Sequence, residues 1–327
     1  MDRLACPGLE WLLAHATLNR RPAQAYEHAL AALFGLEADA PFGALRLLGE
    51  SRDIMEADAR EGFWLCADPV HLRFHHERII LADAGAFDLA ANEVQAIATD
   101  LNREFADVGV FHVADARRWY VRLNTHTAFP AAPLSAVAGR RMEGELPNAP
   151  HASKLRSWLN EVQMFLHGHP VNETRANAGK PAVNSLWLWG AGTLPELGDI
   201  EHDGVWSTDP LAFGLSRAAG TPVHPLPQRL DGLLAHAGPG STQLAVIDDL
   251  LAPVLYEDSH AWHDAMVRLE ENWFAPLRSA LGRQVKALRL VAPTVYGELV
   301  WELGGADRWK IWRRPRSIAT LARELAQ

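Results

Sequence analysis

The chain has 327 residues, of which 48% are hydrophobic and 22% are charged, and this ordinary globular composition excludes disorder and a coiled coil. Its formal net charge of −9 argues against nucleic acid as a partner, and no run approaches the ~20 apolar residues of a membrane helix, so no membrane is expected either. Two cysteines make no disulfide framework and the N-terminal residues lack the pattern of a signal peptide, which together predict a cytoplasmic protein.

The first part of the chain predicts helices followed by a small α+β lobe. Residues 9–34 carry two amphipathic helical patterns, and the texture changes at residues 62–83 to short apolar runs that predict strands joined by tight turns. A helix with one apolar stripe follows at residues 89–105, and the runs GVFHVAD and RWYVRL predict two more strands. The order ββ-α-ββ predicts an inserted α+β lobe at residues 62–124.

The second part alternates strands with helices. Residues 125–150 are rich in Ala, Pro and Gly and predict a return linker, and residues 151–167 predict a helix with an apolar face. Beyond them, strand-like runs such as SLWLWG, QLAVID and KALRLVA are separated by helical segments, the longest at residues 259–281. We therefore expect an α/β core, a sheet flanked by helices in three layers, built from residues 1–61 and 125–327.

A polar loop that precedes one of these strands is the first candidate binding site. It places Asn172, Arg175 and Lys180 before SLWLWG, with Gly190 and Gly192 at the end of the strand. Glycines allow the backbone to approach a ligand closely, exposed amides can cradle an anion, and Arg and Lys supply positive charge. A tight strand-to-loop turn needs the same residues, so an anion pocket and a structural turn are both open.

Neighbouring residues could complete such a pocket. Asn184 would help to hold the anion, and Trp187 or Trp189 would form a wall. Polar side chains also interrupt two strand-like runs of the predicted lobe, where they would either face a cleft or form a buried salt bridge: Asp68, His71 and Arg118.

Two further groups of polar residues have simple alternatives. The acids Asp248 and Asp249 end an apolar strand, and Asp258 and His260 begin the long helix, so the four are a candidate metal site, with a capped, solvated helix as the default. The densest basic run, Arg313, Arg314 and Arg316 beside Lys310, could hold one anion, although a charged, solvated entrance to the last helix is the preferred interpretation.

The run GKPAVNSLWLWGAGTLPEL, with HPVN and Arg175 before it, resembles the signature of the archaeal-type, cofactor-independent phosphoglycerate mutases of the alkaline-phosphatase-like superfamily. ADPVHL at 67–72, RWYVRL at 118–123, the WLWGAG segment and IWRR at 311–314 are similar to a bacterial group of RpfE-type regulatory or phosphoglycerate-mutase-like proteins. The resemblance implies an alkaline-phosphatase-like three-layer core.

Departures from the superfamily pattern decide the expected function. No strand with the metal-binding Asp-Gly pair stands ahead of the first helices, IDDLLAPVLYEDSHAWHDAM replaces PDE-x-GH, and RLVAPTVYGELVWEL replaces DH-x-TP. Two close metals activate the nucleophile in this chemistry, so we expect a degenerate member that binds no cofactor and is non-catalytic. The resemblance to the RpfE-type group implies that such a member acts in regulation by binding an anionic small molecule or a protein.

Two alternatives stay open. The first is an active phosphoglycerate mutase or phosphohydrolase that uses Mn or Zn at a relocated site with Asp248, Asp249, Asp258 and His260. The second is a structural protein that docks a partner through a surface rich in tryptophan, of which the chain has twelve.

Overall fold

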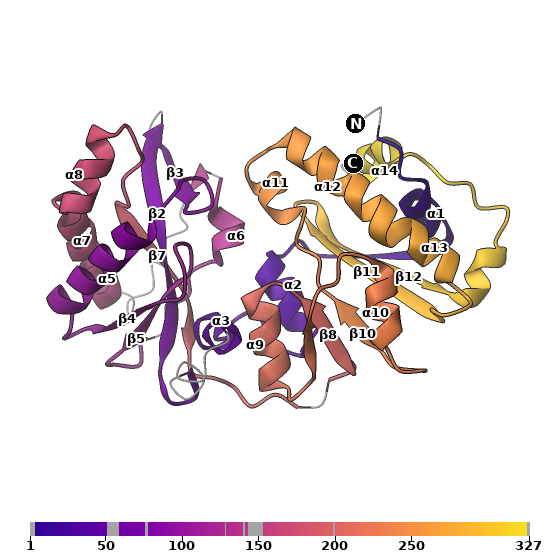
Figure 1. Cartoon of the computed structure of the whole chain (residues 1–327), viewed down its shortest axis with the longest axis horizontal. Coiled ribbons are helices and arrows are strands. Elements are labelled where there is room, and N and C mark those ends of the chain that lie inside the picture. Colours follow the sequence, from indigo (N-terminus) through magenta and orange to yellow (C-terminus); the bar gives the residue numbers. More distant parts are fainter. Residues whose placement is uncertain are drawn as a thin grey trace. The chain divides into compact units, whose positions relative to one another are not determined.

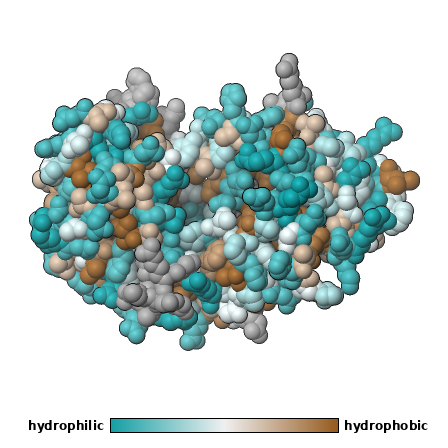
Figure 2. All heavy atoms as spheres, viewed as in Figure 1, coloured by the Kyte–Doolittle hydropathy of each residue, from teal (hydrophilic) through white to brown (hydrophobic). Residues whose placement is uncertain are grey.

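The computed structural model falls into two compact units, and it describes residues 4–50, 59–75, 78–127, 129–139, 141–142, 153–198 and 200–325. Unit 1 comprises residues 1–29, 202–208 and 223–327, and unit 2 comprises residues 30–201 and 209–222. No helix of the described residues is long and apolar enough to cross a membrane. The face of the molecule drawn in Figure 2 is mostly hydrophilic, with apolar residues scattered over it.

Unit 2 is built on one antiparallel sheet. Its strands run in the order β4-β5-β2-β3-β6. The sixth strand, β7, lies outside this order and pairs with β2, which also pairs with β5 and β3. The strands are β2 (Trp64–His75), β3 (Arg78–Asp83), β4 (Gly109–Val113), β5 (Trp119–Leu123), β6 (Arg141–Met142) and β7 (Ser185–Gly192). The lobe predicted at residues 62–124 lies inside this unit, and the pairing of β2 with β7 continues its sheet beyond the predicted lobe boundary.

Helices lie on both faces of this sheet (Figure 1). One face carries α5 (Ala91–Glu104), α7 (Ser153–His167) and α8 (Pro170–Asn177), and the other carries α3 (Phe42–Gly49) and α6 (Leu134–Val137). Helix α9 (Pro210–Ala218) packs on α3. The predicted α/β class, with helices flanking a sheet, is confirmed.

The alternation of side chains along β2 divides the interior of unit 2. Leu65 and Ala67 join the apolar core under α5 and α7, together with Ile97, Trp158 and Leu188. Residues of the opposite parity point toward α3, and they include Trp64, Cys66 and Asp68. A charged side chain is thus built into the layer between the sheet and α3.

Unit 1 contains two three-stranded sheets. In the antiparallel sheet, β1 (Thr17–Arg21) and β11 (Ala287–Thr294) flank β12 (Gly297–Gly304). In the parallel sheet, β9 (Val223–Pro225) and β10 (Gln243–Ala245) flank β8 (Gly204–Ser207). The run KALRLVA predicted β11, but β1 lies inside a region predicted to be helical.

The helices of unit 1 are α1 (Pro7–His15), α10 (Leu230–His236), α11 (Leu251–Leu255), α12 (Ser259–Leu269), α13 (Ala275–Ala280) and α14 (Ile318–Leu325), and α2 (Tyr26–Ala32) crosses the division between the units in sequence. Helices α1, α10, α12 and α13 contribute to an apolar cluster that includes Leu12, Trp206, Leu269 and Trp273. The helix predicted at residues 259–281 is one continuous path in which a π-helical turn, η2 (Glu270–Phe274), joins α12 to α13.

The π-helical turn places a buried carboxylate at the start of α1. Gly8 N donates to Glu270 Oε1 at 2.6 Å, and Leu9 N donates to Glu270 Oε2 at 3.1 Å. A Cβ on Gly8 would lie 2.6 Å from the backbone nitrogen of Ala275, so only glycine allows α1 to approach this closely. The carboxylate satisfies amide groups that the helix itself leaves unpaired.

The two cysteines should be unreactive while the protein is folded. Both are buried and reduced, and burial, followed by the charges of Glu270 and Glu10, raises the pKa of the Cys6 thiol to about 11. Because the thiolate is the reactive form, we expect labelling by a disulfide reagent at pH 8 to be much slower for the folded protein than for the guanidinium-denatured protein. Rapid labelling of one thiol in the folded state would contradict this expectation.

Candidate functional site

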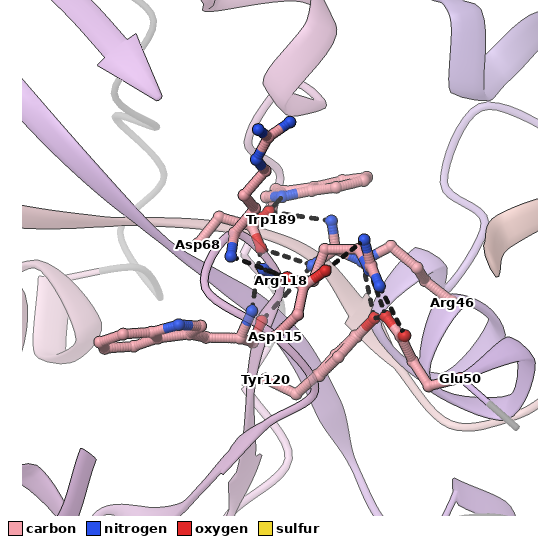
Figure 3. Close-up of polar contacts among 9 residues, drawn as sticks. Arg46, Glu50, Asp68, Asp115, Arg118, Tyr120 and Trp189 are labelled. Carbon is pink, nitrogen blue, oxygen red and sulfur yellow. Dashed lines mark hydrogen bonds and ion pairs between the residues drawn. The ribbon is translucent and has the colours of Figure 1, made fainter. Parts of the chain in front are cut away.

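The side chain of Asp68, on β2, lies at the centre of a buried charge network in unit 2 (Figure 3). Arg46, on α3, makes a two-pronged ion pair with it, with Nη1 at 3.0 Å from Oδ2 and Nη2 at 2.6 Å from Oδ1. Trp189 Nε1, on β7, donates to Oδ2 at 2.9 Å, and the backbone amide of Trp119 donates to Oδ1 at 3.2 Å. Asp68 therefore connects α3 with three strands of the sheet.

The network continues through Tyr120 to a second ion pair. Arg46 Nε donates to the Tyr120 hydroxyl at 3.0 Å, and that hydroxyl donates to Glu50 Oε1 at 2.5 Å. Glu50 also receives two hydrogen bonds from Arg118, from Nε at 2.6 Å and from Nη2 at 3.0 Å. Arg118 Nη1 lies 2.7 Å from Asp115 Oδ2, where the network reaches partly exposed residues.

The surroundings of Arg46 and Tyr120 keep the first side chain charged and the second neutral. Burial, the largest single influence, lowers the pKa of Arg46, but the charge and hydrogen bond of Asp68 together with Cys66 and Tyr120 outweigh burial and raise that pKa well above its usual value. Burial is also the main reason that the pKa of Tyr120 is raised well above its usual value, with Glu50 adding to the effect and Arg46 opposing it. Tyr120 is therefore a neutral donor at physiological pH, and the arginines are permanent cations.

Each of the two carboxylates Asp68 and Glu50 is matched by a guanidinium in fork geometry, which is the arrangement that makes buried ion pairs tolerable. Face-on contacts add to it, because the Arg46 guanidinium lies 4.8 Å from the Tyr120 ring centroid and 5.2 Å from the Trp189 ring centroid. The network holds α3 on the sheet. It does not present a free anion-binding group.

Sequence reasoning found part of this site. Asp68 and Arg118 were expected either to face a cleft or to form a buried salt bridge, and both form buried or partly buried ion pairs. Their partners Arg46 and Glu50 were missed, although an arginine within the otherwise apolar run FGALRLLG was an available signal.

The residues of the predicted anion loop are placed differently. Asn172 is buried, and its side chain bonds to Leu166 O, Val183 O and Val183 N at 2.7–2.9 Å. Arg175 is 1% exposed, with Nε donating to Pro181 O at 2.7 Å and Nη1 bonded to Glu93 Oε2 at 2.8 Å. These contacts tie α8 to the chain that leads into β7.

The other members of the predicted pocket are also distributed along β7 and β2. Asn184 exchanges two hydrogen bonds with the backbone of Leu72, at 2.7 and 2.8 Å, and His71 Nδ1 lies 2.8 Å from Ala182 O. Trp187 is buried, and its Nε1 donates to Ala132 O at 3.0 Å. Lys180 is exposed, and no side-chain hydrogen bond or ion pair joins it to the described residues.

Gly190 and Gly192 allow α3 to approach the end of β7. A Cβ on Gly190 would lie 2.6 Å from Phe42 Cβ, and one on Gly192 would lie 2.6 Å from Pro41 Cβ. The two glycines therefore serve the packing of α3 on β7, a structural role different from the tight turn that the sequence left as the alternative to ligand approach.

The acids proposed for a metal site lie near α11 and α12 of unit 1. Asp258 caps α12, accepting hydrogen bonds from the amides of His260 and Ala261 at 3.1 and 2.9 Å. Among residues 4–325 as far as they are described, no group of three or more His, Cys, Asp or Glu side chains has the arrangement of a metal site. Asp248, Asp249, Asp258 and His260 are thus not gathered into such a cluster in the part of the chain that the structure describes.

The fold and these contacts define an α/β protein with helix-flanked sheets and a buried Arg–carboxylate network. No family model matches the chain. A solved structure, the PH0037 protein from Pyrococcus horikoshii, has the same fold with a TM-score of 0.57 and 16% identity, covering 98% of this chain and 86% of that one.

Sequence comparison gives distant similarity to phosphoglycerate mutases. A probable 2,3-bisphosphoglycerate-independent phosphoglycerate mutase from Geobacter sulfurreducens is 29% identical over 112 residues, 33% of this chain and 28% of the relative. A 2,3-bisphosphoglycerate-independent phosphoglycerate mutase from Methanosarcina barkeri is 25% identical over 177 residues, 50% of this chain and 44% of the relative. The chain thus matches less than half the length of each of these two relatives.

Proposed function

We propose that this protein is a phosphoglycerate-mutase-like binding protein that does not catalyse metal-dependent phosphoryl transfer and that acts in regulation through an anionic ligand or a protein partner. The observation that carries the proposal is the placement of the acids. Asp258 lies in the region where the superfamily carries metal ligands, and its carboxylate caps α12 by accepting hydrogen bonds from two backbone amides. The acids near it form no ligand cluster among the described residues. Phosphoryl transfer of this class needs metal ions to stabilise the attacking and leaving oxygens.

The polar residues of the phosphoglycerate-mutase-like signature support a scaffold role. Arg175, Asn172 and Asn184 hold neighbouring backbone and side chains, so the signature maintains the path from α8 into β7. Lys180 differs, because it is exposed and its ammonium group has no ion-pair partner among the described residues. In the predicted loop, the Lys180 ammonium group is therefore available to bind an anion.

Metal content and turnover test the proposal together. After incubation with Mn²⁺ and Zn²⁺ and removal of free metal, elemental analysis should find no stoichiometric metal, and phosphoglycerate mutase and phosphatase assays should find no turnover. Binding of 3-phosphoglycerate should be unaffected by a chelator and weakened by Lys180→Gln, while Lys154→Gln, at an exposed site on α7, should leave it unchanged.

The opposite result would favour the active enzyme. About two bound metals per chain with turnover, as two-metal phosphoryl-transfer sites contain, would overturn the proposal. Loss of that turnover in Asp248→Ala would then assign the metal site to the acids around residue 248.

A further inference from the structure

Unit 1 contains a pocket that lies far along the chain from the phosphoglycerate-mutase-like signature. Its volume is about 420 Å³, within the range of small-molecule sites. It lies where the end of α1 and the start of β1 meet the chain that leads into α14, and α14 is drawn beside α1 in Figure 1. Its lining residues are Glu10, Leu13, Ala14, Ala16, Thr17, Leu18, Trp301, Arg313, Arg314, Arg316 and Leu321.

Three arginines of the IWRRPR run line this pocket, and each is held differently. Arg313 Nη1 donates to Ala16 O at 2.9 Å and to Ala14 O at 3.3 Å, so its guanidinium is fixed against the end of α1. Arg316 Nη1 bonds both carboxylate oxygens of Glu324, at 2.7 and 2.6 Å. Arg314 is exposed and makes no hydrogen bond or ion pair with the described residues.

The charges of the lining are unbalanced. Glu10 is the acid among the lining residues, and its Oε1 already accepts a hydrogen bond from Ile318 N at 3.3 Å. Backbone carbonyls fix Arg313, whose charge also acts on Asp307, and Arg314 has no counter-ion among the described residues. A positive pocket in a chain whose net charge is −9 attracts anions locally.

Most of the remaining pocket lining is apolar and would favour a ligand with an apolar body. Leu13, Leu18, Trp301 and Leu321 contribute apolar surface to the same pocket. An inorganic ion could meet the arginines but would leave this surface facing water, whereas an anion with an apolar body would cover it. Guanidinium groups bind phosphate and carboxylate oxygens in pairs, so either headgroup suits the arginines.

We propose that this pocket binds a small amphipathic organic anion, in which a phosphate or carboxylate group meets Arg313 and Arg314 and an aromatic or aliphatic body lies on the leucines and Trp301. The proposal is independent of the proposed function. It concerns unit 1, and it holds whether or not the protein catalyses phosphoryl transfer.

Calorimetric titration of the full chain at low ionic strength tests the ligand class. Phenyl phosphate and benzoate supply the two headgroups on the same ring, phenol supplies the ring without charge, and inorganic phosphate supplies charge without the ring. We expect phenyl phosphate or benzoate to bind, and the tighter of the two identifies the headgroup. Equal binding of inorganic phosphate, equal binding of phenol, or no binding of either ring anion up to about 10 mM, a dissociation free energy near 3 kcal/mol, would overturn the proposal.

A pair of arginine variants tests the location. Arg314→Gln should weaken binding of the ring anion about tenfold, the effect of losing one charge-assisted contact, and it removes no contact with the described residues that the fold needs. Arg289→Gln is the matched control, because Arg289 is a partly exposed arginine on β11 of the same unit and lies outside the pocket lining. Equal affinity in Arg314→Gln and the parent protein would refute the site even if the ring anion binds.

Discussion

Replacing Asp68 by asparagine is expected to lower the free energy of unfolding by about 3–5 kcal/mol, the cost of leaving a buried charge without its partner. The variant keeps the shape of the side chain but leaves the Arg46 guanidinium uncompensated between α3 and the sheet (Figure 3). Part of the hydrogen bonding from Trp189 and Trp119 would survive, because the amide oxygen can still accept. Urea denaturation followed by tryptophan fluorescence measures the loss.

An exposed ion pair provides the control for this prediction. Glu302→Gln breaks the ion pair with Arg289, in which Arg289 Nε lies 2.9 Å from Glu302 Oε1 and the side chains of Arg289 and Glu302 are 49% and 44% exposed. Water replaces the lost partner there, so the change should stay within about 0.5 kcal/mol. Similar losses in the two variants would mean that burial does not set the strength of the Asp68 pair.

A local measurement separates the two units in the Asp68→Asn variant. Hydrogen exchange should accelerate at the amides of α3, β2 and β5, since Asp68 and Arg46 connect these elements in unit 2. Amides of the β11–β12 hairpin belong to unit 1 and should keep their protection. Uniform acceleration across both hairpin and network would contradict a local role for the ion pair.

The sequence predicted the elements whose apolar periodicity is strong. β5 and β7 follow from their apolar runs, and α5 and α7 follow from single apolar stripes. β2 is one strand of 12 residues, where the sequence predicted shorter strands joined by tight turns. β1 was missed because TLNRR has no apolar alternation: all five residues are exposed, and pairing with β12 alone makes them a strand. Such an edge strand is defined by its partner, which the local sequence does not contain.

The candidate site shows the same limit. The sequence marked Asp68, Arg118 and Trp189 as polar or bulky residues in strand-like runs. The partner of Asp68 lies on α3, 22 residues away, and the partner of Arg118 directly follows α3, 68 residues away. Arg175 was expected to meet an anion in a loop, and it instead meets Glu93, 82 residues earlier. Charge and spacing alone cannot distinguish a ligand-binding arginine from one that a distant carboxylate neutralises.

Gly214→Ala should destabilise unit 2 by about 3 kcal/mol, at the upper end of the usual cost of overpacking. Helices α3 and α9 meet at two glycines, and a Cβ on Gly214 would lie 1.7 Å from the carbonyl oxygen of Leu45, while one on Gly49 would lie 1.7 Å from that of Pro210. Both obstacles are backbone atoms, so neither can turn aside as a side chain would. The Arg217 Nη1 bond to Leu48 O, at 2.8 Å, would be strained by any separation of the helices.

The sign of this effect is what makes it informative. Alanine is intrinsically favoured over glycine within a helix by about 1 kcal/mol, so an open site in α9 would gain stability from the substitution. Gly168→Ala is the control in the same unit, since nothing lies within 4 Å of its added Cβ and its change should stay within about 0.5 kcal/mol. A more stable Gly214→Ala variant would show that α3 and α9 do not pack as closely as the contact between Gly214 and Leu45 requires. Elements other than α9 would then have to hold α3, and with it the Arg46–Asp68 pair, in place.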